Sequence, residues 1–547
     1  MKKYLLISLL LVVFVACKQK ENPIVFEKYD ETSEIEAQQN HKNDRMKLKM
    51  IQSKYNDMNE VFKSFENDLA YFSEEDYQNL IPFILEKDIP TIQEHVKNRI
   101  LSYEKIALFY LYRIRKYESN NELFLNAIIS LNPTILEEAR LKDKNKPADT
   151  EFSLYGLPIL LKDNINTVGM ATSAGAFVLK DNQTSEDAFI VKKLKENGAL
   201  ILGKANLSEW AYFFCSGCPV GYSAVGGQTL NPYGRKVFET GGSSSGSGVG
   251  VAANYAVAAV GTETSGSILS PSGKNAVVGL KPTIGLLSRT GIVPISSTLD
   301  TPGPMTKSVI DNAIFLNAML GKDNEDEKSV ESNVNFVSEL KKYSLKGKRF
   351  GALENLMTDS LYTRNISILQ RNGAEIVKIN PERAQLNGFL TLLNVDMKYD
   401  LPKYLKNHAD SEIKITSVSD VVEFNSLDSL KRMPYNQELF DGIVRDSTTL
   451  SELEIIKTNL ENSGRAYFNN VIDSLKLDAF LSINNYHAGF AAVAKYPCLT
   501  VPMGFDKTGE PKNMTFISKQ FEEEKLLKIG YAFEKLTKIR KLPKDYK

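Results

Sequence analysis

The chain repeats one local pattern, in which an amphipathic helix is followed by a short buried strand. In TSEDAFIVKKLKENGALILGKANL, we expect Ser185 to cap a helix, Gly198 to end it, and residues 199–202 to form a strand. Similar units are predicted at KRFGAL with LYTRNISILQRNGAEIVKI, and at AYFNNVIDSLKLDAFLSI. Strands that alternate with helices favour an open sheet covered on both faces. We therefore predict one large α/β domain over residues 76–547, with a mostly parallel mixed sheet.

The first residues, MKKYLLISLLLVVFVAC, place two lysines before an uncharged, largely apolar run that ends at Ala16. The run is too short to span a bilayer and is typical of a secretory signal peptide. A small residue before Cys17 resembles the lipobox of bacterial lipoproteins, although Phe14 stands where that motif prefers Leu. We expect a signal peptide over 1–16, lipidation of Cys17, and anchoring in the bacterial cell envelope on the periplasmic or surface side. The alternative is a plain signal peptide with an incidental cysteine.

Residues 17–47 are mostly polar and are predicted to form a spacer between the lipid and the domain. Over residues 48–75, apolar side chains recur at alternating steps of three and four, which predicts an amphipathic helix with one narrow seam. The seam residues are Leu48, Ile51, Tyr55, Met58, Phe62, Phe65, Leu69 and Phe72. We expect this seam to pack on the chain's own domain, and a dimeric coiled coil is the alternative. The oligomeric state stays open.

Charge and cysteine content exclude several classes of function. Lys+Arg and Asp+Glu both number 67, so the net charge gives no attraction to nucleic acid or to an anionic membrane. We expect no nucleic-acid partner, and membrane contact only through the N-terminal lipid. Cys215 and Cys218 could form a disulfide in an oxidising compartment or stay as thiols. A zinc site would need a second ligand pair, and the four histidines lack metal-ligand spacing, so we expect no metal. Cys498 is predicted to lie in the core.

The segment ETGGSSSGSGVGVAANYAVAAVGTETSGSILSP, residues 239–271, places serines and glycines on both sides of an apolar stretch. Its spacing predicts a closely packed helix over 244–254 and a strand over 255–260. Since helix and strand fold back on each other, Ser243 and Ser267 can be neighbours. A serine just beyond a strand, behind glycine and small residues, can lie where backbone N–H groups converge to stabilise an oxyanion.

A serine nucleophile needs a base. Lys162 stands at the exit of the apolar strand predicted at Leu157–Leu161, where burial would lower its pKa and favour the neutral amine. His487 is the histidine nearest a plausible sheet-edge loop, but no acidic residue is placed to orient it. The residues alone therefore leave two interpretations, a Ser/Lys hydrolase or a solvated surface lysine.

Several linked motifs resemble the amidase signature family, in order and at the family's spacing. They are LYGLPILLKDNI, GKANLSEWA, GGQTLNPY, GGSSSGSGVGVAA, GTETSGSI, VVGLKPTIGLLS and YPCLTVPMGF, and the similarity covers roughly residues 90–545. The residues in the motifs SEWA, GGQTLNPY, GGSSSGS and GTET are most similar to those of the peptide amidase branch.

The resemblance implies a role for each residue that matches a family motif. Ser267 matches the nucleophile, Ser243 the bridging serine that follows a cis peptide bond, and Lys162 the general base. The backbone of Thr264, Ser265, Gly266 and Ser267 would form the oxyanion hole. The implied reaction hydrolyses a carboxamide to a carboxylate plus ammonia or an amine, with no metal or organic cofactor.

The chain departs from the family where Ser265 replaces a more usual Gly and Leu269 a frequent Arg, which leaves the substrate open between small-molecule and peptide amides. Two alternatives to an exported amidase stay open. One is a protein like the glutamyl-tRNA amidotransferase subunit that supplies ammonia, which shares the fold. The other is a non-catalytic envelope binding protein on the same fold.

Overall fold

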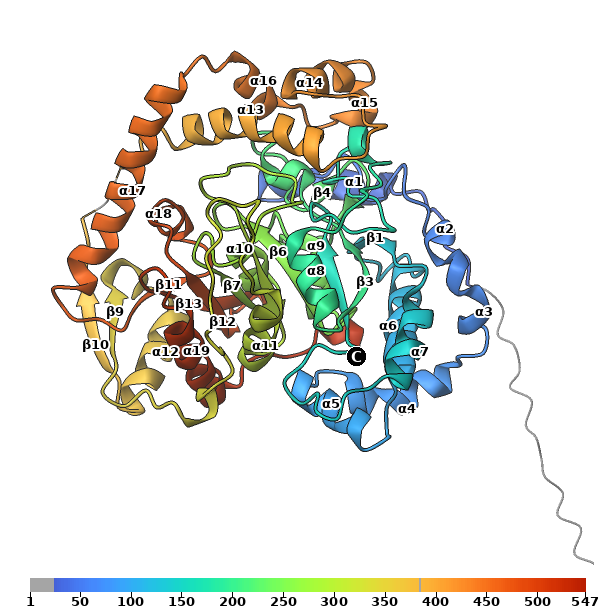
Figure 1. Ribbon diagram of the computed structural model, residues 1–547, viewed down its shortest axis with the longest axis horizontal. Coiled ribbons are helices and arrows are strands. Elements are labelled where there is room, and N and C mark those ends of the chain that lie inside the picture. The colour runs from blue at the N-terminus through green and yellow to red at the C-terminus, as the bar shows by residue number, and fades with distance from the viewer. Residues whose placement is uncertain (1–23, 383–384) are drawn as a thin grey trace, which may run out of the picture.

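An eleven-stranded sheet runs through the computed structural model, which describes residues 24–382 and 385–547 (Figure 1). The strand order is β1-β3-β2-β6-β8-β7-β12-β13-β11-β9-β10. The strands are β1 (Ile128–Leu131), β2 (Pro158–Lys162), β3 (Leu200–Ala205), β6 (Ala258–Glu263), β7 (Val278–Lys281), β8 (Thr301–Thr306), β9 (Arg349–Leu353), β10 (Glu375–Ile379), β11 (Ala479–Ile483), β12 (Cys498–Phe505) and β13 (Pro511–Ile517). A separate pair is formed by β4 (Tyr222–Ser223) and β5 (Gly227–Gln228).

The sheet is mixed, and its parallel pairs lie in two blocks. In one block β2 pairs in parallel with β3 and β6, and in the other β9 pairs in parallel with β10 and β11. Antiparallel pairs from β6 through β8, β7, β12 and β13 to β11 join the blocks. More of the strand pairs are antiparallel than the helix–strand units in the sequence indicate. The reason is that β7 and β8 are joined without a helical crossover, as are β12 and β13. The prediction of one α/β domain around a mixed sheet is confirmed.

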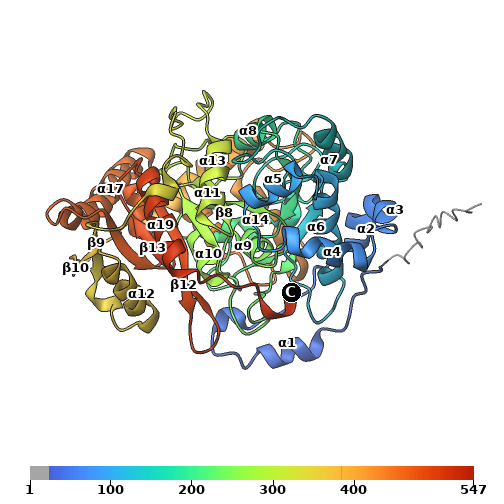
Figure 2. The ribbon, with the colours of Figure 1, turned by 90° about the horizontal axis from the view of Figure 1, so that it is seen from below.

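Helices pack on both faces of this sheet. On one face α11 contacts β8, α8 and α19, whereas on the other α9 contacts β2, β6 and α10 (Figure 2). The helices next to the sheet are α8 (Phe189–Glu196), α9 (Ser245–Ala252), α10 (Leu269–Lys274), α11 (Val309–Met319), α12 (Ser360–Arg371), α18 (Ala488–Ala494) and α19 (Glu523–Thr537).

Helices α8 and α9 are both formed close to their predicted positions. Helix α9 falls within the predicted 244–254 range, and its small residues are needed: a Cβ on Gly246 would lie 2.5 Å from the backbone of Ala127 and Asn206. Helix α8 instead begins at Phe189 with Ala188 as its N-cap, so the prediction that Ser185 caps it is wrong. Residues before α8 are held by Asp187, whose carboxylate accepts the backbone N–H of Val168 at 2.8 Å.

An N-terminal helical layer covers the β1 side of the molecule, in blue to teal in Figure 1. It contains α1 (Thr32–Gln38), α2 (Met58–Phe62), α3 (Glu66–Leu69), α4 (Glu74–Ile84), α5 (Ile89–Lys97), α6 (Tyr103–Glu118) and α7 (Ile135–Lys144).

Short 3-10 turns occur along the chain at η1 (Asp44–Met46), η2 (Lys63–Phe65), η3 (Phe177–Leu179), η4 (Glu209–Tyr212), η5 (Leu340–Lys342), η6 (Glu354–Leu356) and η7 (Lys544–Tyr546).

The single helix predicted over residues 48–75 is not formed. Residues 48–57 are non-helical: the carbonyl of Ile51 accepts the backbone N–H of Gln228 at 2.9 Å, and the Ser53 hydroxyl donates to the carbonyl of Val225. The helical part begins at Met58, and the Asp57 side chain caps it by accepting the N–H of Asn59. The seam nevertheless packs on the chain's own domain, because the same core as the sheet strands includes Leu48, Ile51, Phe62, Phe65, Leu69 and Phe72.

The predictions for the first residues fall mostly outside the described part of the chain. The predicted signal peptide (1–16) and Cys17 lie there, as does the start of the spacer. The described remainder of the spacer lies against the domain, where Arg45 pairs with Glu239 at 3.0 Å and Gln38 donates to the carbonyl of Lys236. Among residues 24–382 and 385–547, no helix has the length and apolar character needed to cross a bilayer.

A second group of helices, which we call the helical cover (residues 389–472), is inserted between β10 and β11 and lies along the top of Figure 1, with α17 descending on the left. It consists of α13 (Phe389–Asn407), α14 (Val418–Ser426), α15 (Ser429–Arg432), α16 (Glu438–Arg445) and α17 (Leu450–Ile472). The cover has its own apolar core, which also takes in Trp210, Phe213 and Phe214 from the loop before β4. That loop connects the cover to the site described next.

Candidate active site

Lys162 is the last residue of β2, and its side chain is fully buried. Its Nζ lies 2.7 Å from Oγ of Ser243, 2.7 Å from Oγ1 of Thr262 and 3.2 Å from the Thr262 carbonyl oxygen. Burial lowers the pKa of the Lys162 amine to about 7, although the carboxylates of Asp300 and Glu263 oppose the shift. A large share of the amine is therefore neutral near pH 7, and a neutral amine can accept a proton.

Ser243 follows a cis peptide bond from Gly242, as the resemblance implied. Its carbonyl accepts the N–H of Ser208 at 3.0 Å and that of Ser245 at 2.9 Å, which fixes the backbone just before α9. Gly241 has φ +64, and a Cβ there would lie 2.7 Å from the backbone of Ser270. Glycine is therefore required two residues before the bridging serine for both conformation and space.

Ser267 lies in the loop between β6 and α10 and is 9% exposed. The N–H of Ser244 donates to the Ser267 carbonyl at 3.2 Å, so this loop lies directly against residues 243–244. The two ends of the segment that we singled out in the sequence are thus brought together, with Lys162 bound to one of them.

Glu263 is a site residue that the sequence reasoning missed. Its carboxylate accepts the backbone N–H groups of Gly266 at 2.7 Å, Ile268 at 2.7 Å and Leu269 at 3.0 Å, and so holds the turn that carries Ser267. A carboxylate at the end of an apolar strand and before a glycine-containing turn marks this position in the sequence, but not which N–H groups the carboxylate binds. Burial raises the pKa of Glu263, and the positive charge of Lys281 works in the opposite direction.

This arrangement corrects one part of the predicted oxyanion hole. The N–H of Gly266 already donates to Glu263, so it is not directed at a substrate. Thr264 and Ser265 remain candidates through their backbone amides, together with the amide of Ser267 itself. The Thr264 side chain donates to the carboxylate of Asp300, which ties the start of the turn to the segment before β8.

A cavity of about 360 Å³ adjoins this cluster. Its inner wall includes Asn164, Thr262, Thr264 and Asp300, and segment 289–297 and helix α13 contribute further lining. Asp300 accepts the N–H groups of Ile295 and Ser296, and burial raises its pKa to about 6. The volume is in the range of small-molecule sites.

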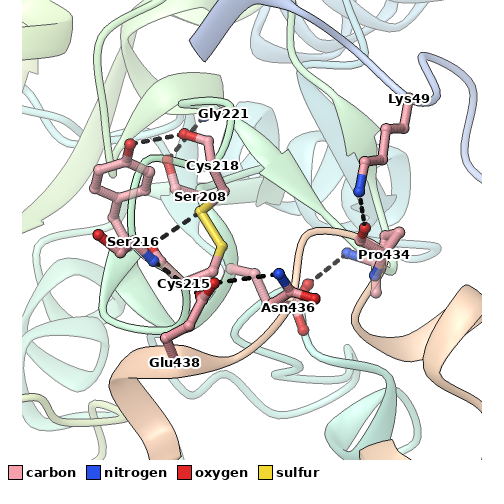
Figure 3. Close-up of a disulfide and its surroundings, with 12 residues drawn as sticks. Lys49, Ser208, Cys215, Ser216, Cys218, Gly221, Pro434, Asn436 and Glu438 are labelled. Atoms are coloured by element: carbon pink, nitrogen blue, oxygen red, sulfur yellow. Dashed lines mark hydrogen bonds between the residues drawn. A yellow bond between two sulfur atoms is a disulfide. The ribbon is translucent and has the colours of Figure 1, made fainter. Parts of the chain in front are cut away.

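Cys215 and Cys218, left open by the sequence, form a disulfide at the edge of the cover (Figure 3). The N–H of Ser216 donates to the carboxylate of Glu438 on α16 at 3.3 Å. In the same loop, the Ser208 hydroxyl accepts the N–H of Gly221 at 2.8 Å, while the N–H of Ser208 donates to Ser243. The disulfide loop therefore connects the helical cover to the backbone of the bridging serine.

The remaining cysteine and the histidine considered as a base lie elsewhere. Cys498 is buried on β12, as predicted. His487 places Nδ1 2.6 Å from Oγ of Ser482 and its ring beside Phe490, and burial lowers its pKa to about 4. Within the described ranges, no group of three or more His, Cys, Asp or Glu residues is placed to hold a metal ion.

Comparisons with known proteins agree with this fold. The family model described as Amidase matches residues 108–482. The probable amidase of Arabidopsis thaliana is 36% identical over 480 residues, which cover 84% of this chain and 92% of that protein. The native peptide amidase of Stenotrophomonas maltophilia is 35% identical in sequence, with a TM-score of 0.79, and the match covers 84% of this chain and 98% of that one.

The fold and the comparisons together define a hydrolase that acts on amide bonds. This chain belongs to the amidase family, and its similarity includes the peptide amidase branch. The relatives also include a glutamyl-tRNA(Gln) amidotransferase subunit from Thermoanaerobacter pseudethanolicus, which is 29% identical over 83% of this chain and 97% of that protein.

Proposed function

We propose that this amidase hydrolyses a carboxamide to a carboxylate plus ammonia or an amine, with Ser267 as nucleophile, Ser243 as proton bridge and Lys162 as general base. The observation that carries the proposal is the buried contact of 2.7 Å between Nζ of Lys162 and Oγ of Ser243, directly beside the turn of Ser267. A depressed lysine pKa makes such a base effective near neutral pH.

The reaction begins when Oγ of Ser267 forms a bond to the carbonyl carbon of the amide. The Ser267 proton passes to Oγ of Ser243, and the Ser243 proton passes to Nζ of Lys162, which becomes an ammonium. The carbonyl oxygen takes the negative charge and accepts hydrogen bonds from the amides of Thr264, Ser265 and Ser267.

Collapse of this intermediate breaks the C–N bond. The proton on Lys162 returns through Ser243 to the leaving nitrogen, which departs as ammonia or an amine. Water then attacks the acyl-serine ester by the same proton route and releases the carboxylate. No metal or organic cofactor takes part in these steps.

The substrate class we propose is a peptide or small-molecule carboxamide, supported by the similarity to a peptide amidase. The test is ammonia or amine release by the full chain and by Ser267→Ala, across a panel of peptide amides, amino-acid amides and acyl amides. We expect release with at least one class, lost in the variant. Equal release by both proteins would contradict the assignment of Ser267.

The relative that belongs to an amidotransferase supports a second candidate, release of ammonia for transfer to a tRNA-bound acyl group. Glutamine is included in the panel without tRNA or ATP. Turnover restricted to glutamine would favour that candidate over a general amidase. Binding without any turnover would favour the non-catalytic envelope protein, against which the presence of Lys162, Ser243 and Ser267 argues.

We also propose that the protein is exported and anchored in the bacterial cell envelope by a lipid on Cys17. The two lysines, the apolar run and the Ala16–Cys17 pair support it. Cys17→Ser should prevent lipidation and release the protein from membranes. Unchanged membrane association of this variant would contradict the proposal.

A further inference from the structure

The amine of Lys162 has three hydrogen-bond partners, and two of them belong to Thr262. These are the side-chain Oγ1 at 2.7 Å and the carbonyl oxygen at 3.2 Å, and the third is Oγ of Ser243 at 2.7 Å. All three groups are buried, so the hydrogen-bond directions are set by protein atoms. Thr262 was not among the residues that the sequence motifs assigned a role.

A neutral amine offers two N–H donors and one lone pair. If Lys162 takes the proton of Ser243, its lone pair must point at the Ser243 hydroxyl, and both N–H groups must find acceptors elsewhere. The Thr262 carbonyl can only accept. The second N–H therefore needs Oγ1 of Thr262 as its acceptor.

We propose that Thr262 is a positioning residue that accepts both N–H groups of the neutral Lys162 amine and thereby aims its lone pair at Ser243. This inference rests on the proposed function, in which Lys162 is the base. The same groups could also adopt the opposite orientation, in which Thr262 donates to Lys162 and the amine donates to Ser243. The inference assigns to Thr262 the selection of the first orientation over this one.

Asn164 supports the accepting role of Thr262. Its side-chain Nδ2 donates to Oγ1 of Thr262 at 3.0 Å. A hydroxyl can accept two hydrogen bonds and donate one. With Asn164 and Lys162 as donors both accepting positions of Oγ1 are filled, so the hydroxyl is held as an acceptor toward both residues.

The same contacts serve the protonated state. The Lys162 ammonium has three N–H donors, and the three acceptors are already in place: both oxygens of Thr262 and Oγ of Ser243. The proton can therefore move between Ser243 and Lys162 without rotation of the amine. The charged groups that act on Lys162 are Asp300 and Glu263. Removal of Oγ1 from Thr262 removes neither of these carboxylates.

The test compares Thr262→Val, which keeps the shape and removes Oγ1, with Thr262→Ser, which keeps the hydroxyl. The probe is a fluorophosphonate, and the readout is the rate of Ser267 labelling as a function of pH. For Thr262→Val we expect a rate about 10- to 100-fold lower, because the base is no longer oriented. We also expect the pH limb, the rising part of the plot of labelling rate against pH, to move about one pH unit lower. The reason is that a lost hydrogen bond destabilises the ammonium of Lys162 more than its neutral amine. Thr262→Ser should restore both.

A matched control is Thr500→Val on β12, which removes a buried threonine hydroxyl whose partner is Oγ1 of Thr515 at 2.8 Å. Its pH limb should stay in place. A wild-type labelling rate and pH limb in Thr262→Val would overturn the inference. A lower rate without the downward shift of the limb would also overturn it, as would failure of Thr262→Ser to restore both the rate and the limb. Circular dichroism checks folding, and if Thr262→Val does not fold, Thr262→Ala takes its place and a wild-type rate in it overturns the inference.

Lys162→Ala is measured beside these variants to separate the two proposals. If it labels at the wild-type rate, the proposed mechanism itself is wrong. If it is inactive while Thr262→Val behaves as wild type, only the role of Thr262 is wrong.

Discussion

The Nζ atom of Lys162 lies 2.7 Å from Oγ of Ser243, and neither side chain is exposed to solvent. Burial removes most of the hydration that would stabilise an ammonium, so the serine is paired with an amine that can be neutral near pH 7. The pair lies where β2 ends beside β6, in a parallel register that places Leu161 opposite Val260. The chemistry thus depends on the parallel block of the sheet.

The pH dependence of turnover follows from this pair. Since the neutral amine is the active form, kcat/KM should rise with pH and level off above the Lys162 pKa of about 7. Lys162→Ala should lower kcat/KM by at least about 10²-fold and abolish this limb. A pH–rate profile measures both. A variant that keeps the limb and the activity would exclude Lys162 as the base.

The His487 side chain provides a test of the alternative base. Its pKa of about 4 means that it does not titrate in the neutral range, and its ring is bound to Ser482. His487→Gln should leave the pH limb in place and keep kcat/KM within about tenfold of the wild type, a smaller loss than removal of a general base gives. If this variant loses the limb, the histidine is the base instead.

Glu263 should contribute to both stability and activity. In Glu263→Gln one side-chain oxygen becomes an NH₂ group that faces backbone N–H donors, so at least one buried hydrogen bond is lost. We expect a loss of about 1–3 kcal/mol in the free energy of unfolding and a lower kcat, because the turn of Ser267 loosens. Urea unfolding and ammonia release measure the two effects. Unchanged values for both would mean that the turn does not depend on Glu263.

The disulfide of the cover loop should stabilise the protein by restricting a short segment of the unfolded chain. Replacing Cys215 and Cys218 together by serine should lower the free energy of unfolding by about 2 kcal/mol. Thermal melting with and without dithiothreitol measures this change. The wild type should melt lower in the reductant, whereas the double variant should not respond. Equal melting of the wild type in both conditions would contradict the prediction.

Local sequence patterns predicted much of the fold, because they record which face of each element is buried. The strand that ends at Lys162 and the strand that ends at Glu263 are both formed, within a few residues of the predicted bounds. The spacing of apolar residues over 48–75 misled the helix prediction. Steps of three and four identify buried positions, but residues 48–57 are fixed by long-range backbone contacts to the β4–β5 pair, which no local pattern records.

For the site, the residue pattern indicated Lys162, Ser243 and Ser267, and the resemblance assigned their roles. The structure places the lysine amine against the bridging serine, with the turn of Ser267 beside it. The roles of Glu263 and Thr262 could not be read from the sequence. Both depend on which N–H groups meet which oxygens, and a motif gives residue types but not hydrogen-bond directions. The same limit explains why Gly266 was assigned to the oxyanion hole although its amide is bound to Glu263.

The central claim is that Ser267 is the nucleophile, and covalent labelling tests it most directly. The full chain is treated with a fluorophosphonate, and the adduct is located by mass spectrometry of the digested protein. We predict one adduct, on the peptide that contains Ser267, and none on Ser267→Ala, whose fold is checked by circular dichroism. Labelling of another serine, or undiminished labelling of folded Ser267→Ala, would contradict the account.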